Sequence, residues 1–345
     1  MPLVPLVSTF VISMLLSVHS IAGEVKIFTW EDYFSPTIIR AFEDQYGHTV
    51  NQTFFESEML RDQVLLSKKA ELYDLIIVDN HTITTLTGKD VLREFAPSLL
   101  GDTSQYTSTS LKACDKYGIP FSFGSMGIGY RNSKVSQPIK SWRDLLEFAK
   151  NNPGTVVLPD EDVDTLVIAL LALGHDPMTS NKEHLKEAYH LLESIIDKLL
   201  VFRTTIGYAL EKGINSKMEA AVFYSGEKEA ISQATSQDDW EYILPEEGTL
   251  MWFECLSAHK NKSLSNATID FLEFISTPEV AAANAEEFWF ATSNKSALQY
   301  TSTHYRNDSE LYPAGLTTKK IYYYELLDDE SMRLRANIVN SLSKR

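Results

Sequence analysis

The stretch that decides the fold is VKIFTWEDYFSPTIIRAFEDQYG, residues 25–47. It predicts a buried strand at 25–29 and a helix that begins at the N-cap Ser35 and ends at Gly47. The apolar face of this helix recurs at helical spacing, in Ile38, Ile39, Phe42 and Tyr46. A strand followed directly by a helix is the unit from which α/β sheets are built. The connection is unusual because it carries two rings and two adjacent carboxylates, WEDY.

The same alternation of strand and helix continues along the chain. Further strands are predicted at 48–55, 73–78, 220–226 and 249–258. Further helices are predicted at 57–70, 82–88, 141–152, 165–174, 184–197 and 227–234, and a pair of helices at 266–289. A chain of 345 residues is too long for one typical core, so we expect more than one domain. The predicted fold class is α/β.

The charge of the chain limits its partners. The net charge of −16 argues against nucleic acid and anionic membrane surfaces and favours cationic partners. The alternative explanation is that an acidic surface keeps the protein soluble.

The N-terminus predicts export. Residues 1–22 contain no Lys, Arg, Asp or Glu, and their apolar run at 10–18 is too short to span a bilayer. Ser20 and Ala22 fit a signal peptide that is cleaved after Ala22, although the usual basic n-region is missing. The chain has two cysteines, Cys114 and Cys255, which an oxidising compartment allows to pair, whereas buried free thiols are the alternative.

Acidic and aromatic side chains recur where the predicted strands end. In open α/β sheets, ligands bind beyond the carboxyl ends of the strands. The candidates at or near these ends are Trp30, Asp32, Tyr33, Asp79, His81, Glu161, Asp164, Tyr224, Glu227, Trp252 and Glu254. No glycine-rich phosphate loop and no Lys or Arg stands among them.

Carboxylates next to rings suit a ligand with several ammonium groups. A carboxylate accepts charge-assisted hydrogen bonds from an ammonium group, while a ring attracts the cation and packs on methylene groups. Polyamines satisfy both demands. Each candidate also has a simpler role: Trp30 as a core ring, Asp79 and His81 as residues of a helix cap, and Glu227 as a charge in the first turn of a helix.

Seven segments together resemble the bacterial periplasmic spermidine/putrescine-binding proteins, a branch of the type II solute-binding proteins. They are FTWEDYFSP (28–36), YDLIIV (73–78), YGIPFSFGSMGIGYRNS (117–133), SWRDLL (141–146), VVLPDEDVDTLVIALLALG (156–174), PEEGTLMWFECLSA (245–258) and FLEFISTPEVAAANAE (271–286). The resemblance implies a two-lobed fold with the ligand between the lobes. It places lobe 1 at 23–129 plus 255–303 and lobe 2 at 130–254 plus 304–345.

The resemblance implies that the residues at the strand ends are ligand contacts, and it adds two further residues to them. Trp30, Asp32 and Tyr33 match the family's Trp-x-acidic-Tyr, and Trp252 and Glu254 match its aromatic-x-Asp, whose acid pairs with the central amine. Phe290 replaces a Tyr of the family, and Tyr324 lies in a poorly aligned segment. Asp79 and His81 fall where relatives often have Ser and Tyr.

The departures from the family bear on the length of the ligand. Glu stands at 161, 227 and 254, where relatives mostly use Asp. Each arm is one methylene longer, so we expect a shorter cavity and a triamine such as norspermidine or spermidine.

The resemblance further implies a periplasmic monomer without catalytic residues, metal or cofactor, which docks on an integral membrane partner. One branch of the family senses norspermidine and acts on a membrane enzyme that controls cyclic di-GMP and biofilm formation, and this chain is more similar to that branch. The alternative is the substrate-binding subunit of a polyamine ABC importer. A ferric-ion binder and a glycosidase are more remote alternatives.

Overall fold

The computed structural model describes residues 22–313, 319–325 and 327–345. The predicted signal peptide therefore lies, except for Ala22, outside the described residues. The strands are β1 (Glu24–Thr29), β2 (Thr49–Phe54), β3 (Leu75–Asp79), β4 (Gly118–Arg131), β5 (Val156–Leu158), β6 (Val201–Phe202), β7 (Ala220–Tyr224), β8 (Trp240–Ile243), β9 (Thr249–Ser257), β10 (Ala291–Thr292) and β11 (Ile321–Tyr323).

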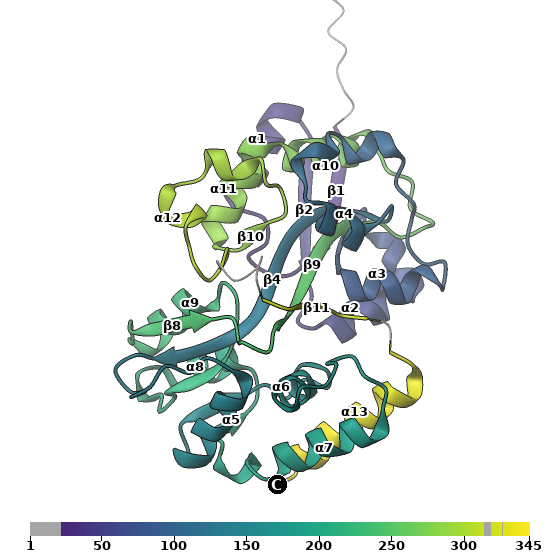
Figure 1. The fold of residues 1–345 in the computed structure, drawn as a ribbon. Coiled ribbons are helices and arrows are strands. Elements are labelled where there is room, and N and C mark those ends of the chain that lie inside the picture. The colour runs from purple at the N-terminus through teal and green to yellow at the C-terminus, as the bar shows by residue number, and fades with distance from the viewer. Residues whose placement is uncertain (1–21, 314–318, 326) are drawn as a thin grey trace, which may run out of the picture.

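Helices lie around these strands (Figure 1). They are α1 (Pro36–Tyr46), α2 (Glu58–Leu65), α3 (Asn80–Thr87), α4 (Ser108–Cys114), α5 (Trp142–Asn151), α6 (Asp164–Leu173), α7 (Lys182–Glu193), α8 (Thr205–Lys212), α9 (Glu227–Thr235), α10 (Asn266–Ser276), α11 (Pro278–Phe288), α12 (Thr303–Arg306) and α13 (Asp329–Ser343). Within the described residues, no helix is both long and apolar enough to cross a bilayer.

The strands run in the order β2-β1-β3-β9-β4-β7-β5-β6, with β10 and β8 also on β4 and β11 on β9. β1, β2 and β3 are parallel to one another, and so are β5, β6 and β7. β4 and β9 pair antiparallel with each other and join these two parallel groups. The predicted α/β class is confirmed.

β4 and β9 pass between two hydrophobic cores and so create two lobes (Figure 1). On β4, Ile119 lies in the core of the first lobe and Ile128 in that of the second. On β9 the direction is reversed, with Leu250 in the second core and Leu256 in the first. The two lobes are thus held together by paired strands.

The predicted lobe boundaries stay a prediction, but one stretch packs differently from them. Tyr305 and Leu311 are buried in a cluster with Ala285 and Ala291, which belong to α11 and β10. The chain after residue 303 therefore first packs against the first lobe. These contacts favour a later boundary than 303.

Two predicted helices are shorter than expected. The helix predicted at 57–70 ends at Leu65 and is followed by a separate 3₁₀ turn at Lys68–Leu72, which the side chain of Ser67 caps. The helix predicted at 184–197 spans Lys182–Glu193, and a 3₁₀ turn at Ile196–Lys198 follows it. In both segments the apolar pattern continues beyond the residue at which the α-helix ends, so periodicity alone overestimated the length of the helix.

The two cysteines form a disulfide, which settles the alternatives that the sequence left open. Cys114 at the end of α4 is bonded to Cys255 on β9, and their Cα atoms are 5.7 Å apart. Both residues are buried in the core of the first lobe. The bridge anchors β9 one residue away from Glu254.

Candidate ligand-binding site

Glu254 on β9 is the most enclosed carboxylate of the predicted site. Only 4% of its surface is exposed. The Trp30 indole Nε1 donates to its Oε1 at 3.0 Å, and the Ser122 hydroxyl donates to its Oε2 at 3.0 Å. Burial raises the pKa of Glu254, although hydrogen bonds from Tyr33, Ser122 and Trp30 act in the opposite direction. A carboxylate held in this way gains from a cation that restores its charge.

Trp30 and Tyr33 form an aromatic wall of the first lobe. Trp30 follows β1 and packs edge-on against Phe55, with the ring centroids 4.3 Å apart. Tyr33 stacks on Phe121 and on Phe290 at 5.9 and 5.7 Å, so the predicted Phe290 belongs to this wall. The turn between them places Asp32 at a positive φ of 58° with its side chain exposed.

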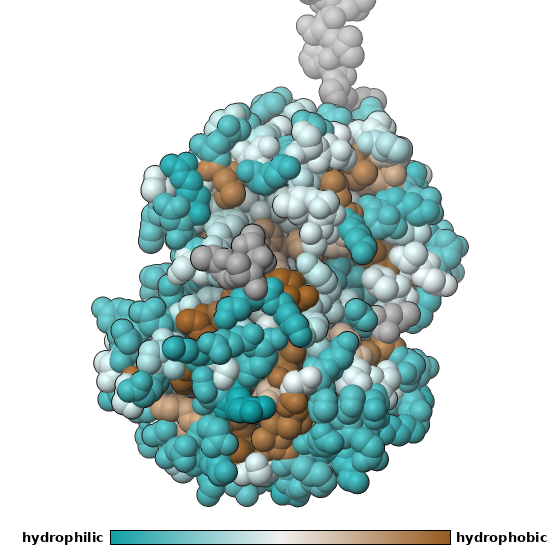
Figure 2. Space-filling view, viewed as in Figure 1, coloured by the Kyte–Doolittle hydropathy of each residue, from teal (hydrophilic) through white to brown (hydrophobic). Residues whose placement is uncertain are grey.

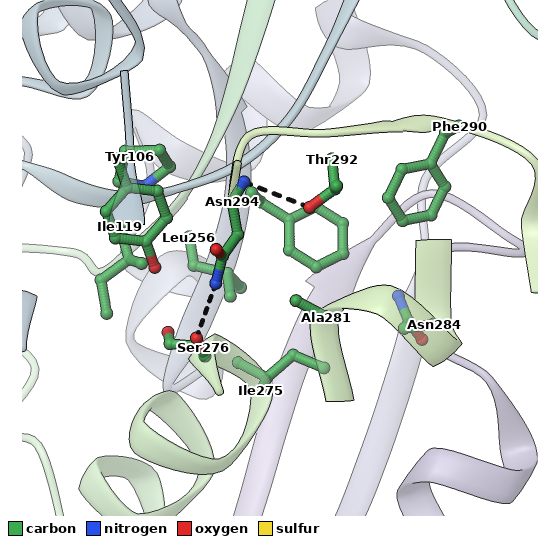
Figure 3. A pocket seen from close by; sticks show the side chains of 12 residues that line it. Tyr106, Ile119, Leu256, Ile275, Ser276, Ala281, Asn284, Phe290, Thr292 and Asn294 are labelled. Atoms are coloured by element: carbon green, nitrogen blue, oxygen red, sulfur yellow. Dashed lines mark hydrogen bonds between the residues drawn. The ribbon is translucent and has the colours of Figure 1, made fainter. Parts of the chain in front are cut away.

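Phe121 and Phe290 also line a small cavity in the first lobe (Figure 3). Its volume of about 20 Å³ is enough for roughly one water molecule. Asn294 also lines this cavity, and its side-chain amide donates to the Ser276 carbonyl at 3.0 Å. The cavity is too small for a polyamine, so we regard it as part of the support behind Tyr33.

Asp164, at the start of α6, is the corresponding carboxylate of the second lobe. It is 6% exposed, and it accepts hydrogen bonds from the hydroxyls of Tyr224 and Tyr324, the latter at 2.6 Å. Burial raises its pKa, and the two hydroxyls partly offset the shift. Tyr324, which the sequence placed with least support, thus lies beside a predicted ligand carboxylate.

Trp252 on β9 adds a third ring to the two tyrosines beside Asp164. Its ring meets the Tyr224 ring edge-on, with the centroids 5.6 Å apart, and it packs closely against Gly124 of β4. A Cβ at Gly124 would stand 2.1 Å from the indole, so only glycine allows this contact.

Asp79 is already occupied by groups of the protein. Its carboxylate accepts from the Thr82 amide at 2.8 Å, which makes it the N-cap of α3, and from the Arg61 Nη2 at 2.7 Å. Burial acts to raise the pKa of Asp79, but the Arg61 guanidinium holds it below its usual value. The helix-cap alternative describes these contacts, and a ligand contact of Asp79 stays a prediction.

His81 lies in the first turn of α3, next to the ring of Tyr324 at 6.0 Å. Its Nδ1 is buried and has no hydrogen-bond partner among the described residues. It therefore remains a candidate contact between the two walls.

Glu227 lies in a second acidic pair with Glu310. Its Oε2 accepts from the Tyr224 backbone amide, and Glu310 accepts from the Lys228 amide, both at 3.1 Å. Burial and the proximity of the two carboxylates raise the pKa of Glu227 to about 8, and burial raises that of Glu310 to about 7. In the structure, the Glu227 carboxylate is bound to the Tyr224 backbone amide. A ligand contact of Glu227 stays a prediction.

Glu161 is exposed near Asp164, and its pKa is raised by partial desolvation and by the charge of Asp164. It stays a candidate contact at the rim of the site.

Sequence analysis missed Glu58, the first residue of α2. Although Glu58 retains exposed surface, desolvation and then the charge of Asp79 raise its pKa to about 8. The charge of Arg61 opposes this shift, and those of Glu254 and Asp164 add to it by smaller amounts. The charges of Glu254 and Asp164 thus both act on Glu58. The signal was available, because Glu58 follows the carboxyl end of β2, as the other candidates follow their strands.

The two hydrophobic cores joined by β4 and β9 define the architecture of a two-lobed solute-binding protein, and the predicted carboxylates and rings lie on both lobes. The chain belongs to the family described as bacterial extracellular solute-binding protein, whose model matches residues 37–313. A norspermidine sensor from Vibrio cholerae is 27% identical over 93% of this chain and 89% of the relative. A spermidine/putrescine-binding periplasmic protein from Escherichia coli is 24% identical over 85% of this chain and 84% of the relative.

A solved structure shows the same fold. The substrate-binding protein of a spermidine/putrescine ABC transporter from Streptococcus pneumoniae superposes with a TM-score of 0.82 at 21% identity, over 94% of this chain and 99% of that chain. The predicted two-lobed periplasmic binding protein fold is therefore confirmed.

Proposed function

We propose that this protein binds a triamine of the norspermidine/spermidine class between its lobes. The observation that carries the proposal is a pair of buried carboxylates beside aromatic rings: Glu254 on the crossing strand β9, next to Trp30, and Asp164 at the start of α6, next to Tyr224 and Tyr324. The names of the relatives from Vibrio cholerae and Escherichia coli support the choice of polyamines.

The charges that face the proposed ligand match a triamine. The charges of Asp164 and Glu254 both raise the pKa of Glu58, whereas Asp79 is paired with Arg61. Three carboxylates match three ammonium groups, and a diamine would leave one carboxylate buried without a partner, which is costly. The exposed Glu161 adds negative charge at the rim.

Competition calorimetry with putrescine, norspermidine, spermidine and spermine at one salt concentration tests this function. We expect norspermidine or spermidine to bind most tightly. Tightest binding of putrescine would contradict the charge count, and no binding of any of the four amines would reject the function.

The glutamate arms provide a separate test of ligand length. Glu161→Asp together with Glu254→Asp shortens each of these two side chains by one methylene and so enlarges the space for the ligand. We expect the preference to move from norspermidine toward the longer spermidine. An unchanged order would show that these glutamates do not measure the ligand.

We propose that the liganded protein acts as a sensor on a membrane signalling enzyme that controls cyclic di-GMP and biofilm formation, as the similarity to the norspermidine sensor suggests. The alternative, an importer subunit, is favoured by the likeness to transporter components. Co-purification with the membrane proteins encoded beside its gene, with and without norspermidine, separates the two roles. A signalling receptor as partner supports the sensor, and a permease supports the importer.

The proposal includes export and the absence of chemistry on the ligand. We expect the mature protein from the periplasm to begin at Gly23, which N-terminal sequencing tests. Mass spectrometry after long incubation should recover the amine unchanged.

A further inference from the structure

Arg61 on α2 is a cation built into the acidic site. Its side chain is fully buried, yet neither the sequence pattern nor the proposed ligand contacts account for it. Its Nη2 donates to Asp79 at 2.7 Å and also to the Thr82 hydroxyl, and its Nε donates to Asp62 at 3.0 Å.

The surroundings of this guanidinium do not satisfy it completely. The Nη1 atom is buried without a hydrogen-bond partner in the part of the chain that the structure describes. Burial acts to lower the pKa of Arg61, but the carboxylates of Asp79 and Asp62 raise it above the ordinary value, so the group stays charged. A buried donor without a partner is unfavourable, so hydrogen bonding alone gives a poor reason for this residue.

Arg61 lies beside the ligand carboxylates. Asp79 is directly opposite Glu254 in the antiparallel pair of β3 and β9, which places the two side chains next to each other on one face of the sheet. Glu58 is three residues before Arg61 on α2, so both belong to neighbouring positions on that helix. The guanidinium is thus at the edge of the group formed by Glu58, Glu254 and Asp164.

We propose that Arg61 is a specificity-determining residue whose guanidinium occupies, at Asp79, the place that a further ammonium group of the ligand would take. Arg61 neutralises Asp79 and thereby limits the ligand to three cationic groups. This inference rests on the proposed function and adds to it the reason why the site rejects a tetramine.

The main test removes the internal cation. Arg61→Gln leaves the Asp79 carboxylate without its counter-charge and frees space beside it. We measure the affinities for spermine and norspermidine by calorimetry and expect their ratio to rise at least about tenfold in favour of spermine. Arg61→Lys, which keeps the charge, should leave the ratio within about threefold of the unaltered protein. Arg40→Gln, on the exposed face of α1, is the matched control for loss of an arginine.

The opposite change should have the opposite effect. Asp79→Asn keeps an oxygen for the Thr82 amide but leaves Arg61 with only Asp62 as its counter-charge, so putrescine should gain on norspermidine by at least about tenfold. This variant decides the question if Arg61→Gln does not fold. The double variant Arg61→Gln/Asp79→Asn restores neutrality and should return both ratios toward those of the unaltered protein.

The outcomes separate this inference from the proposed function. If the unaltered protein binds a triamine but neither single variant changes the ratios, Arg61 only supports the fold and the inference is wrong. A uniform loss of affinity for all amines has the same meaning. If the unaltered protein binds no polyamine, the proposed function fails first, and the inference fails with it.

Discussion

Trp30 and Glu254 are 224 residues apart in the sequence, and the indole Nε1 of one donates a 3.0 Å hydrogen bond to the carboxylate of the other. The bond joins the end of β1 to β9, a strand that passes between both lobes. The sequence predicted Trp30 and Glu254 as two separate ligand contacts, whereas in the structure the hydrogen bond fixes their side chains relative to each other. The face of the molecule shown in Figure 2 is largely hydrophilic, in agreement with the net charge of −16.

We expect Glu254→Gln to weaken triamine binding by on the order of 2 to 5 kcal/mol, because an enclosed ammonium loses its counter-charge. Calorimetry measures the loss. Glu241→Gln, at an exposed position of β8, should leave affinity unchanged. Equal affinities of Glu254→Gln and the unaltered protein would remove Glu254 from the site.

Two substitutions of Trp30 separate its ring from its hydrogen bond. Trp30→Phe keeps an aromatic face but removes the donor to Glu254, and we expect a loss of about 0.5 to 1.5 kcal/mol of binding free energy. Trp30→Ala also removes packing and cation–π attraction, so the loss should reach about 1 to 3 kcal/mol. Should Trp30→Ala bind as tightly as Trp30→Phe, the ring does not contact the ligand.

The ligand-free protein should become less stable as the pH rises from about 5 to about 8.5. Folding raises the pKa values of Glu58 and Glu227 to about 8, above those of the unfolded chain, so the native state holds more protons in this window. Stability conferred by such groups is present at low pH and is lost as the pH passes their native pKa values.

Urea unfolding at several pH values tests this dependence. Glu227→Gln should flatten the profile, whereas Glu229→Gln, exposed on the same helix, should not. A saturating triamine should reduce the slope, because it stabilises the ionised carboxylates of the site. Stability that increases with pH across this window in the ligand-free protein would contradict the prediction.

Replacing both Cys114 and Cys255 by Ala should lower the free energy of unfolding by about 2 to 4 kcal/mol, because the bridge closes a loop with a sequence separation of 141 residues. Chemical denaturation of the variant measures the loss. Both cysteines are buried, so reductant should act on the native protein slowly and on the unfolded chain rapidly. Equal stability of the variant and the unaltered protein would show that the bridge does not constrain the unfolded chain.

The sequence alone predicted most of the helices and strands and supplied the candidate residues at the strand ends. Apolar periodicity and caps such as Ser35 depend on neighbours within a few residues, so they are readable locally. The rule that ligands lie at the carboxyl ends of strands then led to Trp30, Asp164 and Glu254. The same rule applied to β2 would have found Glu58.

Only the tertiary structure decided which carboxylates lie close to one another and which are already paired with a cation of the protein. Arg61 pairs with Asp79, and Glu227 lies beside Glu310, although nothing in the local sequence links either pair. The disulfide between Cys114 and Cys255 was undetermined for the same reason. The free charge of a site depends on through-space distances of a few ångström, which are set by how β3, β9 and α2 pack, whereas periodicity along the chain determines only which face each residue takes.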